Sequence, residues 1–355
     1  MQPVRVLIVD DSAVIRKVLS NMLASDPEIV VAGTAANGRQ GLDRIPEMKP
    51  DLITLDIEMP HMDGLETLVE IRKLYPRLPV IMFSTLTERG AAATLDALAR
   101  GASDYVTKPS HEGAEVSQER VRDELLRKIK SLCAARVPRP RPESIRVPVF
   151  PRPSGRVDVV AIGSSTGGPN ALTGLLPQFP ADFPVPIVIV QHMPPLFTRL
   201  FAERLNVLSR LEVREGREGE KLQRGNVWIA PGDQHMTVTR KETEAVLGIN
   251  HDVQENSCRP AVDVLFRSVA RAYGGNVLGV VLTGMGADGT RGAAEIRGAG
   301  GEIIVQDEAS SVVWGMPGSV VAANLADRIY PLDGIAAQVV RRVSQRRAFA
   351  GGARV

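Results

Sequence analysis

Residues 163–168, which read Gly-Ser-Ser-Thr-Gly-Gly, could carry a nucleophile. They directly follow the largely apolar stretch 157–162, so a buried strand would end at a serine flanked by glycines. Glycine permits a sharp backbone turn and the close approach of a substrate. Only one register fits the spacing Gly-x-Ser-x-Gly, because Ser164 has Ile162 two positions before it. If the chain is a serine hydrolase, the pattern predicts Ser165 as the nucleophile.

A serine hydroxyl needs a neighbouring base, and His192 is the histidine best placed to act as one. It follows the apolar stretch 187–191 and should share a sheet edge with Ser165. His235 and His251 instead lie in polar, hairpin-like segments. A lone histidine is more often structural, but a position on the same edge as the serine favours His192 as the general base.

The base must in turn be oriented by an acid. A third apolar strand, 276–282, leads into a glycine-rich loop that contains Asp288. An aspartate at such a position could instead cap the following helix. Three other acids compete for the role but do not close so apolar a strand: Asp233, Asp263 and Asp307. The same loop could present the backbone amide of Met285 to a developing oxyanion.

The order of these residues along the chain separates them from a common hydrolase family. The α/β-hydrolases place the serine first, the acid second and the histidine last. Here the order is Ser165, His192, Asp288. The serine motif alone therefore does not assign the chain to that family.

A second group of polar residues lies in the first third of the chain. Asp10, Asp11 and Asp56 come directly after short apolar runs, as does Ser84, and Lys108 follows another. The ends of parallel strands share one edge, where ligands bind. Clustered carboxylates repel one another unless a cation neutralises them, and Mg²⁺ prefers oxygen ligands. The alternative is that these acids only cap helices in solvent; polar residues at so many strand ends favour a magnesium and phosphoryl site.

The elements that would position this first group alternate strand and helix. The expected strands are 4–9, 29–35, 52–55, 80–83 and 105–106, and the expected helices include 64–75, 91–100 and a last helix at 121–136. Such alternation predicts a doubly wound parallel sheet, flavodoxin-like, in an α/β protein. We expect this domain to span residues 1–125.

A change of composition separates a second domain from the first. Residues 137–156 hold six prolines and five arginines against one acid, Glu143, which predicts a stiff, solvated linker within 126–156. The second domain, 157–347, is expected to be a mostly parallel α/β domain. Its expected strands are 157–162, 187–190, 227–230, 277–282 and 303–305. Shorter polar strands between residues 211 and 249 predict an antiparallel edge.

The composition is that of an ordinary globular protein. The chain has 355 residues, 44% hydrophobic and 24% charged, with a net charge of +2, which argues against a dedicated nucleic-acid binder. No apolar run approaches the roughly 18 residues of a membrane span. The N-terminus lacks a secretory pattern, and Cys133 and Cys258 form no metal or redox motif, so we expect a cytoplasmic protein.

Residues 1 to about 125 resemble a response-regulator receiver domain. The resemblance rests on the acids and strand-end residues above and on residues 59–64, Met-Pro-His-Met-Asp-Gly. It implies Mg²⁺ and a histidine kinase as phosphodonor. The implied roles are metal binding by Asp10, Asp11, Asp56 and the Glu58 backbone carbonyl, phosphoacceptance by Asp56, and a phosphoryl switch through Ser84, Tyr105 and Lys108.

Nearly the whole chain resembles the chemotaxis protein-glutamate methylesterase family, of the CheB type. The matching stretches are 163–168, 191–194, 230–233, 259–263 and 282–289. The resemblance implies a triad of Ser165, His192 and Asp288 with the Met285 amide in the oxyanion site, and no cofactor for the esterase. It also implies hydrolysis of glutamate γ-methyl esters on chemoreceptor cytoplasmic domains, deamidation of receptor glutamines, and control by Asp56 phosphorylation.

Two other classes of function remain open from the sequence. Both domains could be docking surfaces of a catalytically silent, phosphorylation-dependent interaction protein. Receivers also drive transcription factors, and the linker is basic, but no helix-turn-helix pattern follows Arg156. We therefore expect neither nucleic-acid binding nor membrane insertion.

Overall fold

The computed structural model describes residues 2–108, 114–134, 155–241 and 244–344. The chain divides into two compact units, Met1–Pro140 and Arg141–Val355. The exact limits of the predicted domains, 1–125, 126–156 and 157–347, remain predictions. Most of the proline- and arginine-rich linker, at 137–154, and residues 345–347 lie outside the described residues.

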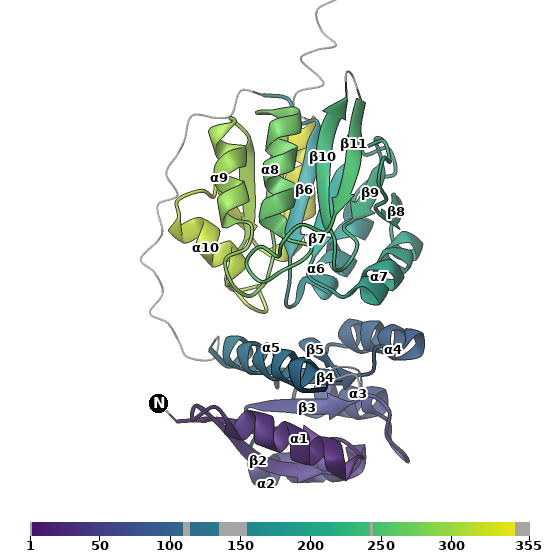
Figure 1. Ribbon diagram of the computed structural model, residues 1–355, viewed down its shortest axis with the longest axis vertical. Coiled ribbons are helices and arrows are strands. Elements are labelled where there is room, and N and C mark those ends of the chain that lie inside the picture. Colours follow the sequence, from purple (N-terminus) through teal and green to yellow (C-terminus); the bar gives the residue numbers. More distant parts are fainter. Residues whose placement is uncertain (1, 109–113, 135–154, 242–243, 345–355) are drawn as a thin grey trace, which may run out of the picture. The chain divides into compact units, whose positions relative to one another are not determined.

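The first unit is a five-stranded parallel sheet in the order β2-β1-β3-β4-β5 (Figure 1). The strands are β1 Val4–Val9, β2 Ile29–Ala35, β3 Leu52–Asp56, β4 Val80–Ser84 and β5 Asp104–Thr107. The helices are α1 Ala13–Ala24, α2 Gly38–Met48, α3 Gly64–Leu74, α4 Glu88–Ala99 and α5 Ala114–Ala134. Helix α5 begins before residue 121, where the sequence predicted its start. Its predicted end, at residue 136, lies outside the described residues. The doubly wound fold expected from strand–helix alternation is confirmed.

Local sequence explains why these helices begin where they do. Ser12, Asn37 and Thr87 each accept a backbone hydrogen bond at the start of α1, α2 and α4. Asp63 forms a capping box with Glu66 at the start of α3. Helices α1, α2 and α4 each start within four residues of the end of the preceding strand, whereas α3 starts eight residues after β3.

The second unit contains a seven-stranded parallel sheet in the order β14-β13-β12-β6-β7-β9-β8. Its strands are β6 Val159–Ser164, β7 Ile187–Gln191, β8 Glu212–Glu215, β9 Asn226–Ile229, β12 Val277–Val281, β13 Glu302–Gln306 and β14 Arg328–Tyr330. Its helices are α6 Gly168–Leu175, α7 Pro195–Leu208, α8 Val262–Tyr273, α9 Thr290–Gly298, α10 Met316–Ala322 and α11 Leu332–Ser344, with a 3₁₀ turn at Leu176–Gln178. The central strands are buried along their whole length, as expected of a sheet covered on both faces.

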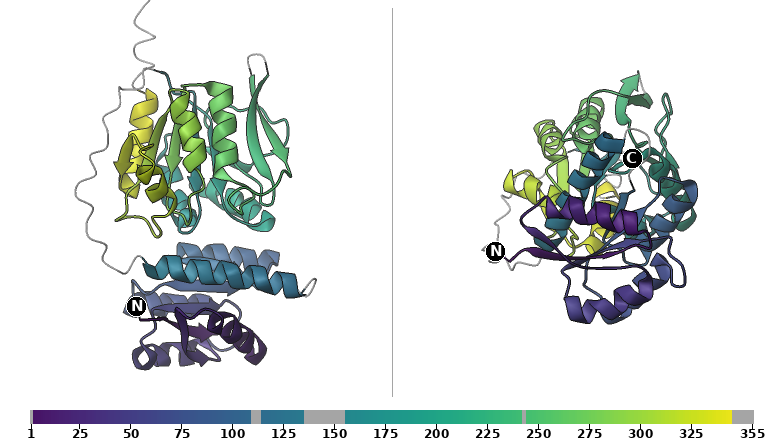
Figure 2. Two further views of the ribbon diagram at one scale, coloured as in Figure 1. Left: turned by 60° about the vertical axis from the view of Figure 1, so that its left-hand side comes forward. Right: turned by 60° about the horizontal axis from the view of Figure 1, so that its bottom comes forward.

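The antiparallel pair expected between residues 211 and 249 exists, but it is not an edge of the large sheet. Strands β10 His235–Lys241 and β11 Glu244–Asn250 form a separate two-stranded sheet. The edge strand of the large sheet, β8, pairs parallel to β9. The hairpin packs on α8 through Met236, Val238 and Leu247, which join the core of the unit (Figure 2). A hairpin with one apolar face can bury that face against a helix as well as by joining the edge of a sheet.

The core of the second unit lies between the sheet and α8. It includes fully buried Trp228, Phe266 and Val262, together with apolar side chains of the central strands. The described helices include none that is long and apolar enough to cross a membrane. The packing of α8 against β6 and β12 fixes the start of that helix near the carboxyl ends of those strands.

Candidate active site

Three neighbouring strands bring the predicted triad to one edge of the large sheet. Strand β6 lies between β7 and β12, and the segment after each of them carries one predicted residue. Ser165 follows β6, His192 follows β7, and Asp288 lies in the loop after β12. The chain leaves β6 towards β7 on one side and reaches β12 on the other, which is the topological switch point where α/β sheets bind ligands.

Backbone contacts pin the turn that carries Ser165. Its N–H donates to the Thr283 carbonyl at 3.1 Å, and its carbonyl accepts from the Gly168 amide at 2.7 Å. Gly167 has a φ of 78°, the left-handed conformation that favours glycine. A Cβ on Gly168 would lie 2.0 Å from Gln191 Oε1, so this position also requires glycine. The glycines therefore serve the turn, as the motif predicted.

The two adjacent serines have different surroundings. Ser164 is fully buried and donates its hydroxyl to Gln191 Oε1 at 2.7 Å. Ser165 is half-buried, and among the described residues its hydroxyl has no hydrogen-bond partner. Gln191 also donates to the Ser165 carbonyl at 3.0 Å, so one amide side chain holds both serines. This arrangement leaves Ser165 available for chemistry and supports the register that selected it.

His192 is held next to the serines by strand pairing. The backbone N–H of His192 donates to the Ser164 carbonyl at 3.2 Å, which continues the β6–β7 register. Its Nε2 lies 2.8 Å from Asp288 Oδ2, and the imidazole side chain is 15% exposed. His235, one of the two histidines set aside from the sequence, is fully buried and bonded to the backbone of Val253 and Ala261. Of these two histidines, only His192 contacts Asp288 among the described residues.

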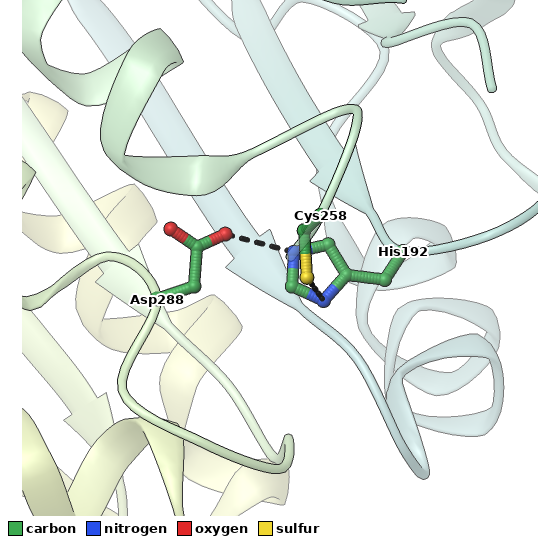
Figure 3. Close-up of side chains that lie close together, drawn as sticks. All are labelled: His192, Cys258 and Asp288. Atoms are coloured by element: carbon green, nitrogen blue, oxygen red, sulfur yellow. Dashed lines mark hydrogen bonds and ion pairs between the residues drawn. The ribbon is translucent and has the colours of Figure 1, made fainter. Parts of the chain in front are cut away.

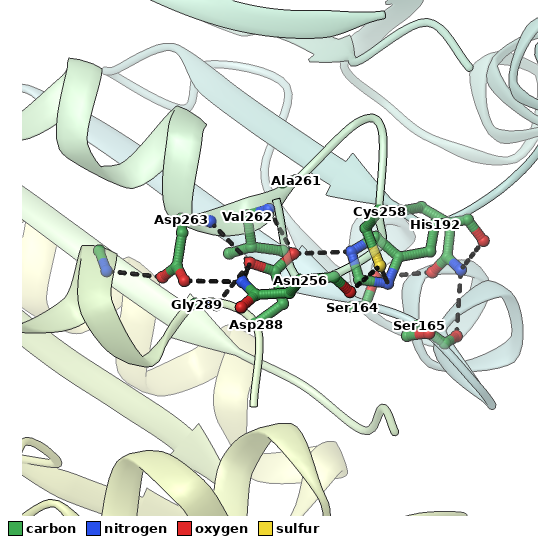
Figure 4. Close-up of polar contacts among 12 residues, drawn as sticks. Ser164, Ser165, His192, Asn256, Cys258, Ala261, Val262, Asp263, Asp288 and Gly289 are labelled. Atoms are coloured by element: carbon green, nitrogen blue, oxygen red, sulfur yellow. Dashed lines mark hydrogen bonds and ion pairs between the residues drawn. The ribbon is translucent and has the colours of Figure 1, made fainter. Parts of the chain in front are cut away.

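Asp288 is buried and accepts hydrogen bonds from every side. Beyond His192, its donors are the Val262 N–H at 2.7 Å, the Asp263 and Gly289 N–H groups at 3.0 Å each, and Asn256 Nδ2 at 2.8 Å (Figure 4). Burial alone would raise the pKa of Asp288, but the His192 contact and the backbone N–H donors hold it below its ordinary value. The carboxylate stays charged and keeps a proton on Nε2 of the imidazole.

His192 has a second neighbour that the sequence did not reveal. Cys258 Sγ lies 3.6 Å from Nδ1, the ring nitrogen that does not contact Asp288 (Figure 3). Burial disfavours the charged imidazolium, but the electrostatic interaction and hydrogen bond with Cys258 and the contact with Asp288 outweigh this and raise the pKa of His192 to about 10. The spacing of the cysteines along the sequence matches no metal motif. In the folded chain, however, ligand atoms of Cys258, His192 and Asp288 lie within 4.8 Å of one another.

The loop after β12 lies directly against the nucleophile. A Cβ on Gly284 would fall 2.9 Å from the Ser165 Cβ and 2.3 Å from Met316 Sδ. The Gly284 amide donates to the Val313 carbonyl at 3.0 Å, whereas the Met285 amide has no acceptor among the described residues. A free amide beside the nucleophile can bind a developing oxyanion.

Gln191, Asn256 and Cys258 are site residues that the sequence analysis missed. Gln191 stands directly before His192 and could have been found as the last residue of a strand that ends at the site. Asn256 and Cys258 come from a turn between the hairpin and α8, and nothing in their spacing indicates a contact with His192 or Asp288.

The predicted carboxylate site of the first unit also assembles. Asp10, Asp11 and Asp56 lie with carboxylate oxygens within 4.8 Å of one another. Lys108 Nζ lies 2.8 Å from Asp56 Oδ1 and 3.3 Å from Asp10 Oδ2. Burial, together with the charge of Asp10, raises the pKa of Asp56 to about 6 despite Lys108. Among the described residues, Asp56 Oδ2 is buried without a hydrogen-bond partner, and Asp10 Oδ2 has only the longer Lys108 ion pair.

The remaining receiver residues lie at or near the same edge. Ser84 is buried at the end of β4 and donates to the Gly90 carbonyl at 3.1 Å. Tyr105 lies buried in β5, where burial raises its pKa well above the usual value. Glu58 is exposed two residues beyond β3.

Comparison with known proteins agrees with both halves of this description. Residues 160–339 match the CheB methylesterase family, and residues 6–117 match the response regulator receiver domain. A protein-glutamate methylesterase/protein-glutamine glutaminase of Trichodesmium erythraeum is 50% identical over 351 residues, covering 97% of this chain and 100% of the relative. One from Nocardioides sp. is 49% identical over 358 residues, covering 98% and 97%.

A solved structure resembles the second unit. The catalytic domain of the Thermotoga maritima CheB methylesterase is 41% identical, with a TM-score of 0.52, and the match covers 53% of this chain and 99% of that one. The chain therefore belongs to the CheB methylesterase family, with an N-terminal response regulator receiver domain joined to the α/β hydrolytic domain.

Proposed function

We propose that this protein is a phosphorylation-regulated serine esterase that hydrolyses glutamate γ-methyl esters on the cytoplasmic domains of chemoreceptors. The observation that carries this proposal is the His192–Asp288 contact at 2.8 Å, beside the strand end that presents Ser165. Family membership supplies the class of reaction. The proposed substrates lie in the cytoplasm, and we place the enzyme there with them.

The geometry supports a two-step acyl transfer. Ser165 Oγ attacks the ester carbonyl carbon while His192 takes the hydroxyl proton, and the tetrahedral oxyanion binds the Met285 amide. Collapse breaks the bond to the methoxy oxygen, which leaves as methanol with the proton from His192. Water then attacks the acyl-serine by the same route and releases glutamate and free Ser165. Because Nε2 contacts Asp288, the proton moves through Nδ1, and only neutral His192 can accept it.

The same machinery accounts for glutamine deamidation. Attack of Ser165 on a side-chain amide gives an equivalent tetrahedral intermediate, which expels ammonia instead of methanol. Relatives are named both as methylesterases and as glutaminases. We therefore propose deamidation of receptor glutamines as a second activity at this site.

The receiver would control the esterase through Asp56 as phosphoacceptor and a histidine kinase as phosphodonor. The buried Asp56 Oδ2, which has no partner among the described residues, and the neighbouring carboxylates fit a hard cation, and Asp10, Asp11, Asp56 and the Glu58 carbonyl would hold Mg²⁺. When bound, Mg²⁺ neutralises negative charge on the carboxylates and on an incoming phosphoryl group. Lys108 is positioned to pair with that phosphoryl group. We propose the buried Ser84 and Tyr105 as the side chains whose packing then changes.

Methanol release from methylated receptor fragments tests the esterase proposal. We expect Ser165→Ala to lose at least about 10³-fold in rate, because the nucleophile is gone. Ser164→Ala is the matched control, since it removes the same atom one residue away, and it should retain most of the activity. Equal losses in the two variants, or no covalent labelling of Ser165 by a fluorophosphonate, would favour a silent docking protein instead.

Phosphorylation of the receiver tests the regulatory proposal. The esterase rate is compared with and without a small phosphodonor and Mg²⁺, in the wild-type protein and in Asp56→Asn. We expect a change of rate in the wild-type protein alone, because Asn cannot accept the phosphoryl group. Equal rates in all four conditions would contradict control by Asp56.

A further inference from the structure

The buried side chain of Gln191 joins three groups at the edge of the sheet that carries the candidate site. Gln191 ends β7 and is the register partner of Ser164, the last residue of β6. Its Oε1 accepts from the Ser164 hydroxyl at 2.7 Å, and its Nε2 donates to the backbone carbonyls of Ser165 at 3.0 Å and His192 at 3.2 Å. Because a carbonyl can only accept, these two contacts require the amide nitrogen and leave the amide oxygen for Ser164. The surroundings therefore fix the orientation of the amide.

The two carbonyls belong to the residues whose side chains are proposed to react. The Ser165 carbonyl also accepts from the Gly168 N–H at 2.7 Å, a bond within the turn that follows β6. Gln191 adds a bond between turns, because one hydrogen of its amide goes to the Ser165 carbonyl and the other to the His192 carbonyl. The same side chain thus ties the turn after β6 to the segment after β7.

The start of α6 leaves the space that this amide fills. A Cβ on Gly168 would lie 2.0 Å from Gln191 Oε1 and 2.9 Å from Ser164 Oγ. The φ of Gly168 is not positive, so the lack of space, and not the backbone conformation, requires glycine here. The Gln191 side chain is only 1% exposed. If the amide were removed, water could not readily replace the hydrogen bonds that its partners lose.

We propose that Gln191 is a positioning residue, which aligns the Ser165 hydroxyl with the His192 imidazole by tying together the peptide groups that carry them. This inference rests on the proposed serine-esterase function. Proton transfer needs the two groups within hydrogen-bond reach, and a misplacement of about 1 Å can cost about 10²-fold in rate. The Gln191 amide bonds to backbone carbonyls and not to the reacting side chains. Its loss should therefore lower kcat and leave KM nearly unchanged, because substrate binding does not depend on this alignment.

Gln191→Met tests the proposal, because methionine keeps the length of the side chain and removes its hydrogen bonds. In the full chain, we expect kcat for methanol release from methylated receptor fragments to fall by about 10- to 10²-fold, with KM changed by less than about twofold. Gln178→Met is the matched control. It makes the same change in the second unit, where an exposed amide donates to the Gly174 carbonyl, and kcat should not change. A kcat of wild-type size in Gln191→Met, or a loss that lies in KM, would overturn the proposal.

A second substitution separates positioning from stability. Gln191→Met leaves the buried Ser164 hydroxyl without its acceptor, and Ser164→Ala removes that hydroxyl. The double variant should therefore unfold at a higher denaturant concentration than Gln191→Met, as followed by the fluorescence of Trp228 and Trp314, while its kcat stays low. Recovery of kcat together with stability would overturn the proposal, because a loss of folding would then explain the slow reaction.

Covalent labelling gives a readout that needs no receptor. The reaction of a fluorophosphonate with Ser165 uses the same proton transfer to His192, so Gln191→Met should be labelled about tenfold or more slowly than the wild-type protein. A wild-type protein that is labelled but releases no methanol would contradict the proposed substrate without affecting this comparison. Equal labelling rates in the wild-type protein and Gln191→Met would overturn the inference, and no labelling of the wild-type protein would overturn both.

Discussion

Asp56 and Asp288 are both buried aspartates near carboxyl ends of parallel strands, yet their surroundings differ in kind. Asp56 ends β3 beside two other acids, with one oxygen unpartnered among the described residues and only Lys108 to offset the charges. Burial raises its pKa to about 6. Asp288 is surrounded by hydrogen-bond donors, and its pKa lies below the ordinary value. The same side chain is left incomplete in one unit and fully satisfied in the other.

This difference matches two kinds of work. A carboxylate with unmet hydrogen-bonding capacity gains free energy when a cation or a phosphoryl group arrives, so it suits a position whose state must change. A satisfied carboxylate gains nothing by moving and can hold an imidazole in one tautomer through every turnover. The receiver carboxylate is thus suited to binding and releasing ligands, and the hydrolytic one to keeping the same hydrogen bonds throughout the reaction.

The largest expected effect tests whether the Asp288 carboxylate holds His192 in one tautomer. Asp288→Asn should lower kcat by about 10⁴-fold, because an amide cannot hold the productive tautomer of His192. Methanol release measures the loss. Asp263→Asn is the matched control, since Asp263 is also buried and bonded to Asn256 but does not contact His192, and it should lose much less. Similar losses in both variants would mean that the network, and not the imidazole contact, sets the rate.

The same substitution should affect stability with opposite signs at the two aspartates. The raised pKa of Asp56 means that its stability contribution falls as pH rises from about 4 to 6, so Asp56→Asn should stabilise the receiver at pH 7 by about 1–3 kcal/mol. The lowered pKa of Asp288 means that its contribution is present above the unfolded pKa and is lost only in acid. Asp288→Asn should therefore destabilise by about 1–3 kcal/mol at pH 7.

Separate probes can read the two units. Both tryptophans, Trp228 and Trp314, lie in the second unit, so fluorescence during denaturant unfolding reports on Asp288→Asn. Amide hydrogen exchange of β1 and β3 reports on Asp56→Asn. Free-energy changes of the same sign would contradict the comparison.

Magnesium should stabilise only the incomplete site. At ten times its dissociation constant, Mg²⁺ should raise the free energy of unfolding of the receiver by about 1.4 kcal/mol. Hydrogen exchange in β1 and β3 measures this against a magnesium-free sample. Asp10→Asn removes one of the clustered carboxylates and should abolish most of the gain. Equal protection of the second unit would show that the effect is not specific.

The smallest expected effect concerns the charge beside His192. The esterase needs neutral His192, so its activity should rise with pH towards the raised pKa of about 10. Cys258→Ser removes the sulfur whose electrostatic interaction favours the imidazolium, so the pKa of His192 should fall and the rising limb should move to lower pH. The pH profile of kcat/KM measures this. Cys133→Ala should leave the profile unchanged, and a shift to higher pH in Cys258→Ser would contradict the assignment of cause.

Much of this fold could be predicted from the sequence because the central strands are apolar runs. Strands β6, β7 and β12 end within two residues of their predicted limits, and parallel pairing then brings Ser165, His192 and Asp288 to one edge. The roles of these residues remain predictions, although their placement agrees with them.

Other features leave no local pattern in the sequence. The alternation in β10 and β11 indicates a hairpin, but it does not say whether the hairpin joins a sheet or packs on α8. Cys258 reaches His192 from 66 residues away through a turn with unusual backbone angles. Such a contact depends on the packing of the whole unit, which periodicity and spacing do not encode.

The close packing around Gly168 and Gly284 limits how the enzyme could be redesigned. Any side chain at either position would overlap Gln191 or the nucleophile itself, and no residue is smaller than glycine. The space next to Ser165 at these two positions can therefore be neither filled nor enlarged by substitution. Changes meant to admit other esters therefore have to be made at positions other than these two glycines.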